Sequence, residues 1–152
     1  MKEQFIHIRT DGATYYYSDR EMTVYHREGG PAVKFPAGGK EWYLNGKRHR
    51  EDGPAIDYTN GYKAWYINNK LHREDGPAAE YANDWKNWYI NGKLHREDGP
   101  AVEYTNGYKD WYLNDEHLTE AEFNARMNPV ELTLQEIAEK FGVSVCKLKI
   151  KK

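Results

Sequence analysis

The chain repeats itself with a period of 23 residues. The segment His-Arg-Glu-Asp-Gly-Pro-Ala begins at His49, His72 and His95, and a weaker copy, His-Arg-Glu-Gly-Gly-Pro-Ala, begins at His26. A tryptophan keeps the same step, at Trp42, Trp65, Trp88 and Trp111. A fixed period of this length is typical of repeat architectures, whose units bury their apolar faces by stacking on one another. The period therefore predicts a stack of similar units, in which a recurring residue is more often scaffold than active site.

The composition indicates an ordered chain with a thin core. Charged residues make up 30% of the 152 residues, a proportion that also occurs in disordered chains. The chain nevertheless has 5 Trp, 13 Tyr and 4 Phe. Aromatic rings bury a large area each, so they can form a core where aliphatic residues are scarce. We expect an aromatic core.

Charge and cysteine content limit the partners and the compartment. The formal net charge of −2 argues against nucleic acid as a partner, because a general nucleic-acid binder needs a basic excess. Cys146 is the only cysteine, which excludes an internal disulfide and suits a reducing cytosol. No apolar run is long enough to span a bilayer, and residues 1–5 lack the apolar stretch of a secretion signal. We expect a soluble, cytoplasmic protein with no membrane contact.

Turn signals divide the chain into three parts and predict antiparallel β-hairpins. We divide it into an N-terminal β cap with a degenerate repeat (1–25), the 23-residue repeats (26–117) and a C-terminal helical cap (118–152). Each repeat has two turn signals, since Asn-Gly pairs adopt the positive φ angles of a two-residue hairpin turn. They are Asn60-Gly61 and Asn106-Gly107, and, after each Trp-Tyr pair, Asn45-Gly46, Asn68-Asn69 and Asn91-Gly92. The predicted fold class is mainly β.

The two ends differ from the repeats. Residues 15–20 resemble residues 42–47 in kind, and Phe5–Ile8 is expected to form a strand that covers the edge of the first repeat. In the tail, residues 119–122 and 133–136 are capping boxes that begin two short helices. Gly142 is the expected C-cap of the second helix.

Side-chain alternation predicts which face of the sheet is exposed. The position of Ala64 is Glu41, Asn87 and Asp110 in the other repeats, and this polar variety favours a position that faces water. Trp65 would then point into the core. A single β-bulge would invert this assignment.

The same alternation predicts a partner-binding surface. An outer column of tyrosines would form a patch of the kind that marks a partner site, because tyrosine combines rigid apolar area with a hydroxyl. The alternative is that these cross-strand aromatic pairs only stabilise a thin sheet. The predicted binding residues are the column Tyr43, Tyr66, Tyr89 and Tyr112, the flanking Tyr62, Trp85 and Tyr108, and an acidic row of Asp57, Glu80 and Glu103.

The repeat resembles a variant of the MORN repeat family over residues 26–117. The closest stretch is residues 42–49, Trp-Tyr-Leu-Asn-Gly-Lys-Arg-His, although Arg-Glu-Asp-Gly-Pro stands where the family has a glycine after the histidine. The resemblance implies a β-hairpin stack, or solenoid, that acts as a binding module. The His-Arg-Glu-Asp-Gly-Pro-Ala motif is similar to a motif in uncharacterised proteins of tailed bacteriophages. It implies a phage factor in the host cytoplasm that binds and inhibits a bacterial defence protein.

The His-Arg-Glu-Asp segment offers metal ligands and acid–base groups, but its geometry favours a structural role. Two or more strands per repeat, about 4.8 Å each, separate equivalent residues by about 10 Å or more, whereas zinc ligands lie about 2 Å from the ion. We expect Arg–carboxylate bonds between adjacent coils instead. No nucleophile motif or phosphate-binding glycine loop is present. The sequence therefore predicts no catalytic residue, no metal and no cofactor, with a metal-dependent hydrolase on the histidine column as the least favoured hypothesis.

The tail supports an alternative function. Residues 134–144 resemble the first helix and turn of a helix-turn-helix, with lysines at 147, 149, 151 and 152 placed near phosphates. Glu136 and Glu139 oppose this interpretation because they repel phosphate, and no Arg, Asn or Gln follows Ser144 to contact base edges. A DNA-binding regulator is the alternative, and a helical cap that closes the stack is the simpler interpretation.

Overall fold

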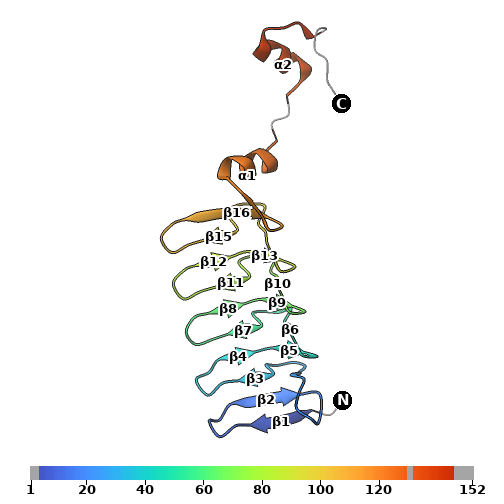
Figure 1. Cartoon of the computed structure of the whole chain (residues 1–152), viewed down its shortest axis with the longest axis vertical. Helices are drawn as coiled ribbons and strands as arrows, with labels where there is room; N and C mark the ends of the chain where they lie inside the picture. Colours follow the sequence, from blue (N-terminus) through green and yellow to red (C-terminus); the bar gives the residue numbers. More distant parts are fainter. Residues whose placement is uncertain (1–3, 130–131, 146–152) are drawn as a thin grey trace.

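The computed structural model describes residues 4–129 and 132–145. It confirms the predicted fold class, a long antiparallel sheet of hairpins followed by two short helices (Figure 1). The main sheet has eleven strands, in the order β1-β2-β3-β4-β7-β8-β11-β12-β15-β16-β17. Their bounds are β1 (Phe5–Ile8), β2 (Thr14–Tyr17), β3 (Val33–Lys34), β4 (Lys40–Glu41), β7 (Ile56–Asp57), β8 (Lys63–Ala64), β11 (Ala79–Glu80), β12 (Lys86–Asn87), β15 (Val102–Glu103), β16 (Lys109–Leu113) and β17 (Glu116–Leu118).

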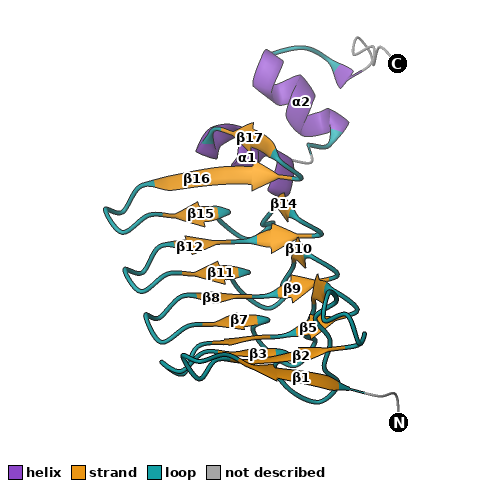
Figure 2. Cartoon of the chain, turned by 60° about the horizontal axis from the view of Figure 1, so that its bottom comes forward, coloured by secondary structure: helices purple, strands orange, loops and turns teal. Residues whose placement is uncertain are grey.

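Each repeat contributes two hairpins, which lie side by side along the stack (Figure 2). The first hairpin belongs to the main sheet, as β7 and β8 do. The second is a short pair beside the sheet: β5 (Tyr43–Leu44) with β6 (Lys47–Arg48), β9 (Tyr66–Ile67) with β10 (Lys70–Leu71), and β13 (Tyr89–Ile90) with β14 (Lys93–Leu94). Because each repeat adds two strands to the main sheet, successive repeats lie about 9.4–9.8 Å apart.

The two turn signals give hairpins of different kinds. Asn45 and Gly46 both have positive φ angles, 50° and 74°, as the predicted two-residue turn requires. In the other hairpin only Gly61 is positive, at 88°, and Tyr58 N–H donates to the carbonyl oxygen of Tyr62 at 2.9 Å. The prediction of a two-residue turn is wrong there. The Asn60 side chain accepts from Tyr62 N–H at 3.0 Å and so supports a longer turn with one left-handed residue.

The recurring histidine joins one repeat to the next. His72 Nδ1 accepts a hydrogen bond, 3.1 Å long, from the backbone N–H of Asn91, the first residue of the next short turn. A backbone bond of 3.1 Å from Arg73 N–H to the carbonyl of Tyr89 lies beside it. The same side-chain bond recurs from Asn45 to His26, from Asn68 to His49 and from Asn114 to His95. Every histidine of the repeat therefore positions the turn of its neighbour.

The recurring arginine holds the loop between repeats. The Arg73 guanidinium lies 4.0 Å from the centre of the Trp65 ring and donates to the carbonyl of Pro77 at 3.2 Å. It also bonds Asp75 in its own loop at 2.8 Å and Glu80 on the strand that opens the next repeat at 2.9 Å. The expected Arg–carboxylate link between adjacent units is therefore present. The Arg–Trp contact recurs between Arg50 and Trp42 and between Arg96 and Trp88.

The N-terminal segment contains a degenerate repeat, displaced by one residue from the predicted alignment of residues 15–20 with 42–47, which placed Tyr15 at the tryptophan position. Tyr16 occupies the tryptophan position: its N–H donates to the carbonyl of Ala32 at 2.8 Å, as Trp42 N–H does to Ala55. The guanidinium of Arg27 lies 3.9 Å from the centre of the Tyr16 ring. Strand β2 pairs with β3 of the first repeat, and β1 pairs with β2. The edge of the first repeat is therefore covered by β2, and the predicted strand β1 forms the end of the sheet beyond it.

Both predicted capping boxes begin helices. Helix α1 (Glu120–Met127) starts at Thr119, buries Phe123 and packs on β16 and β17, where it closes the stack as a cap. Helix α2 (Leu134–Phe141) starts at Thr133 and ends at Gly142, which has a φ of 61°. It lies away from the sheet (Figure 1) and leaves Phe141 70% exposed. Within residues 4–129 and 132–145, neither this helix nor any other has the length and apolarity that a membrane span needs.

The Arg–Trp contact requires glycine at the third position after the arginine. A Cβ built on Gly53 would lie 2.9 Å from Arg50 Cζ, closer than atoms pack. We expect Gly53→Ala to lower the free energy of unfolding by about 1 kcal/mol, because the guanidinium must leave the indole or the loop must shift. Chemical denaturation measures this change.

A double-mutant cycle with Arg50→Ala provides the control. Once the guanidinium is absent, the added methyl group has space, so Gly53→Ala should cost nothing in that background. An equal loss of stability with and without Arg50 would show that the glycine is needed for another reason.

Candidate functional site

The column that contains Ala64 is buried, which overturns the predicted inside and outside. Glu41, Ala64 and Asn87 are 6%, 0% and 8% exposed, although their polar variety predicted a position facing water. The prediction fails because each polar member has its own hydrogen-bond partner. Asn87 accepts from the indole N–H of Trp85 at 2.7 Å, and Asp110 accepts from the Tyr104 hydroxyl at 3.0 Å. We call this side of the sheet the tyrosine face.

Glu41 is the centre of the most polar part of this face. Its carboxylate accepts hydrogen bonds from the hydroxyls of Tyr43, at 2.8 Å, and Tyr58, and Arg48 Nη2 lies 3.6 Å away. Burial and the bond to Glu41 raise the pKa of Tyr43 to about 12, and the same causes raise the pKa of Tyr58. Two phenols and one guanidinium therefore satisfy a carboxylate that would be costly to bury alone.

The predicted tyrosine column does lie on one face, together with Tyr62. Its members are half-buried because they lie against the buried column instead of standing in water; they are Tyr43, Tyr66, Tyr89 and Tyr112. The tryptophans of the opposite face are half-buried too, beneath the arginines. The prediction of a tryptophan core opposite an open tyrosine surface is therefore wrong. Flat side chains cover both faces of a single sheet.

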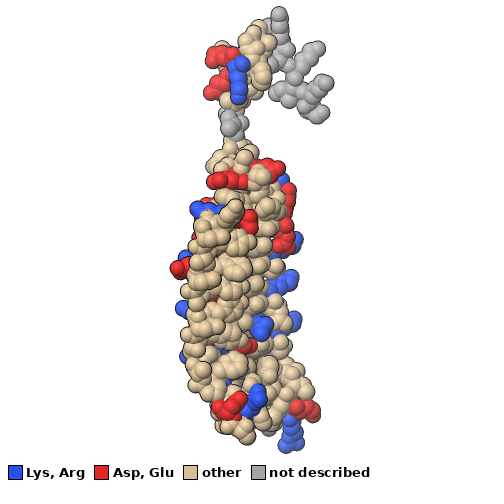
Figure 3. Space-filling model, turned by 60° about the vertical axis from the view of Figure 1, so that its left-hand side comes forward, with Lys and Arg blue, Asp and Glu red and all other residues tan. Residues whose placement is uncertain are grey.

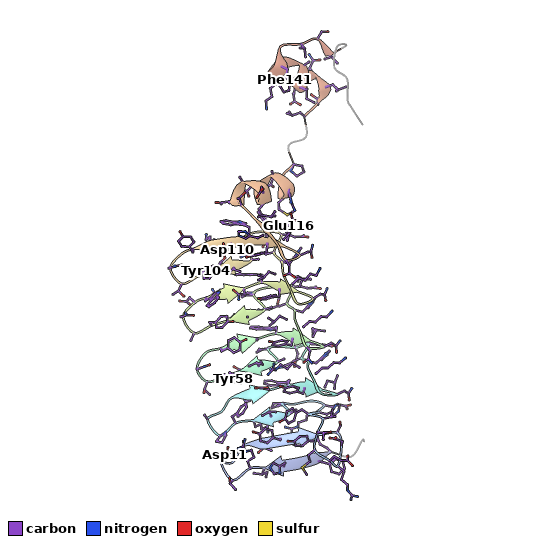
Figure 4. All side chains as sticks on the ribbon, in the orientation of Figure 1. Asp11, Tyr58, Tyr104, Asp110, Glu116 and Phe141 are labelled. Carbon is purple, nitrogen blue, oxygen red and sulfur yellow. The ribbon has the colours of Figure 1, made fainter. Side chains whose placement is uncertain are left out.

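A continuous row of aromatic rings follows the turns of the main hairpins. The ring centres of Tyr62 and Tyr81 lie 4.9 Å apart, as do those of Tyr81 and Trp85, and Trp85 lies 5.4 Å from Tyr104. Tyr58 and Tyr104 mark this side of the stack in Figure 4. We call the row the aromatic edge; it comprises Phe35, Tyr58, Tyr62, Tyr81, Trp85, Tyr104 and Tyr108.

The aromatic edge is nearly free of charge. Figure 3 shows an uncharged strip along the turns, with charged side chains on both flanks. In the four turns, residues 35–39, 58–62, 81–85 and 104–108, Asp84 is the only charged residue. Exposure increases toward the C-terminal end, where Tyr104 is 36% and Tyr108 is 73% exposed. Sequence reasoning identified Tyr62, Trp85 and Tyr108 but not the continuous row. The pattern that could have predicted the row is an aromatic residue immediately before and after the turn, as at Tyr58 and Tyr62.

The predicted acidic row does not border the tyrosines. Asp57 pairs in register with Lys40 and Lys63, and residues directly opposite each other point to the same face. Lys63 and Ala64 are adjacent in β8 and point to opposite faces. The acidic row therefore points away from the tyrosine face, to the face that carries the tryptophans, which we call the tryptophan face. Glu80 and Glu103 also bond Arg73 and Arg96 on that side. The ten predicted binding residues are thus divided between two faces.

The histidines are engaged in the scaffold. Nδ1 of each repeat histidine accepts a backbone N–H, and Nε2 lies 3.4–3.8 Å from a glutamate two residues later. In the part of the chain that the structure describes, no three His, Cys, Asp or Glu side chains gather in a way that could hold a metal ion. Structural use accounts for the recurrence of the segment.

The tail gives only part of the predicted helix-turn-helix. Helix α2 and its C-cap are present as expected. The second helix and the lysines at 147, 149, 151 and 152, like Cys146, lie outside the described residues. DNA binding by this segment stays a prediction.

Comparisons with known proteins add no family. No protein-family model matches the chain, and no curated protein matches its sequence. The stack of hairpins is compatible with a MORN-like repeat without identifying one.

The raised pKa values predict unfolding in alkali. Folding holds the Tyr43 and Tyr62 protons more tightly, since the pKa of each is about 12, against about 10 for an unfolded tyrosine. Their contribution is complete below pH 10 and is lost as the pH rises toward 12, because the unfolded chain releases these protons first. We expect the free energy of unfolding to fall steeply over that window. Chemical denaturation at neutral pH and at successive alkaline pH values measures it.

The variant Tyr43→Phe tests the cause. It has no phenolic proton to release, so its stability should fall less steeply with pH than that of the parent chain. An equally steep fall would assign the pH dependence to other groups.

Proposed function

We propose that this chain is a non-enzymatic protein-binding repeat protein, and that the aromatic edge is its contact surface. The single observation that carries this proposal is the uncharged strip of aromatic side chains along the turns, with charges on both flanks (Figure 3). Depletion of charge and enrichment of Tyr and Trp distinguish the centres of protein interfaces from the remaining surface.

The rigidity of the edge supports binding. From Phe35 to Tyr104 each ring lies 4.9–6.0 Å from the next, so the rotamers of these rings are limited before a partner arrives. Tyr108, at the end of the edge, is 73% exposed. Binding then costs little side-chain entropy, which is the advantage of aromatic anchors in interfaces. The ring edges and the turn residues remain available for contacts, whereas the hydroxyls of Tyr58 and Tyr104 already donate to Glu41 and Asp110.

The proposed site keeps some predicted residues and gives others a lesser part. Tyr62, Trp85 and Tyr108 belong to it. The tyrosines of the predicted column lie across the buried column on the same face and would extend the contact; they are Tyr43, Tyr66 and Tyr89 of the short hairpins and Tyr112 of β16. Asp57, Glu80 and Glu103 are left out, because they point to the opposite face.

The proposed partner is a protein of a bacterial host. The repeat motif resembles that of tailed-bacteriophage proteins, which supports a partner from the bacterial host. The same resemblance favours a defence protein as the partner and its inhibition as the result of binding. Such a partner meets the chain in the host cytoplasm.

Changing the exposed end of the edge tests the proposal. Tyr108→Ala with Thr105→Lys removes a ring that is 73% exposed and places a charge in the strip. We expect the affinity for the partner to fall at least about tenfold, because exposed aromatic anchors carry much of an interface's binding energy. Proteins retained from bacterial lysate by the parent chain are identified by mass spectrometry, purified, and titrated against both chains.

A matched double variant elsewhere provides the control. Phe141→Ala with Asn124→Lys also removes an exposed aromatic ring and adds a charge, but on the two C-terminal helices instead of on the turns of the main sheet. It should bind like the parent chain, and both variants should melt at the parent's temperature. Equal affinity of the edge variant and the parent for every retained protein would reject the edge as the contact surface.

A further inference from the structure

Three equivalent grooves indent the tryptophan face, one for each pair of successive His-Arg-Glu loops. The central groove lies between the loops at Arg50–Gly53 and at His72–Asp75, with Trp65 and Ile67 between them. The groove before it has Trp42 and Leu44 in these positions, and the groove after it has Trp88 and Ile90. Each groove therefore combines an apolar floor with two loop walls, and none of them belongs to the aromatic edge.

The walls present negative charge outward. The side chains of Glu51, Asp52 and Glu74 are 83%, 84% and 85% exposed, whereas that of Arg50 is only 22% exposed. The difference arises because each arginine lies flat on a tryptophan ring and donates to a proline carbonyl. The lining of the central groove contains no lysine, and its two arginines are bonded to Asp52 and Asp75, so Glu51 and Glu74 are its outward carboxylates.

The spacing of the grooves limits the shape of an occupant. Successive grooves are one repeat apart, which is about 9.4–9.8 Å for two strands of the sheet. A polyproline II helix has three residues per turn and rises about 3.1 Å per residue, so its side chains return to the same face after about 9.3 Å. A β-strand repeats its face every two residues, after about 6.6 Å, and does not match the grooves.

We propose that the tryptophan face binds an extended basic peptide in the polyproline II conformation, with Lys or Arg at every third position and one such side chain in each groove. The aliphatic stem lies on the Trp and Ile or Leu floor, and the cationic end lies between the exposed carboxylates of the two walls. A long basic side chain suits both parts, because its stem is apolar and its charge is terminal. This surface is separate from the aromatic edge.

Two synthetic peptides of identical composition test the spacing. One consists of four Lys-Pro-Pro units, and its isomer has the four lysines adjacent and the prolines after them. We expect the first to bind at least about tenfold more tightly at low salt, because only its lysines match the grooves. Fluorescence anisotropy of the labelled peptides against the full chain measures both dissociation constants. Equal binding would mean attraction to net charge only and would overturn the proposal, as would no binding of the first peptide.

Substitutions in the walls test the location. Glu51→Gln, Glu74→Gln and Glu97→Gln together remove one carboxylate from three of the four loops that flank the grooves, at side chains 74–85% exposed. We expect binding of the spaced peptide to weaken at least about tenfold. The control Glu21→Gln, Glu120→Gln and Glu139→Gln has the same change of charge at exposed positions away from the grooves and should bind like the parent. Equal weakening in both triple variants would overturn the assignment to the grooves.

The edge variant separates this proposal from the proposed function. Tyr108→Ala with Thr105→Lys should leave the affinity for the spaced peptide unchanged, because those residues are absent from the groove linings. A loss of peptide affinity in that variant would place the peptide on the aromatic edge and overturn the groove assignment.

Discussion

The sheet is one layer thick, and the arrangement of its side chains follows from that constraint. A sheet normally buries a face against a second sheet or a layer of helices. Here the small alanines at Ala55, Ala78 and Ala101 are 0% exposed, and flat groups cover the two faces of the sheet. On one face the flat groups are indoles with guanidinium planes on top, and on the other they are phenols. The chain is therefore rich in aromatic residues and poor in aliphatic ones, because flat rings cover the faces of its sheet.

The local structure was largely predictable from the sequence. Asn45-Gly46 predicted its two-residue turn, and Thr119 and Thr133 the helix starts, because each depends on contacts within a few residues. The period predicted the stack because similar units make the same contacts with their neighbours. The inside and outside of the sheet were not predictable in the same way. The rule that polar variety indicates exposure fails at Glu41 and Asn87. Tyr43 and Trp85, each two residues away, satisfy their side chains by hydrogen bonds, which a pattern of polar and apolar residues does not contain.

The same limit applies to the candidate surfaces. Sequence reasoning grouped Tyr62, Tyr66 and Asp57, and alternation along the strand correctly joined the first two. Asp57 was assigned to the wrong side because its face depends on the register with Lys63, which no single-strand pattern contains. The result is a molecule with two chemically different surfaces, an uncharged aromatic one and a corrugated one with outward carboxylates.

The hydrogen bonds between repeats join only neighbouring repeats, and this affects how the number of repeats can change. The His72–Asn91 bond and its equivalents join only adjacent coils, so a coil needs nothing from more distant ones. In-frame duplication of a 69-base-pair unit, which is three bases for each of the 23 residues in a period, would therefore insert one more coil without redesign of the others. Recombination can therefore change the number of repeats, and with it the length of the stack. The capping helix at one end and the terminal strand at the other stay the same.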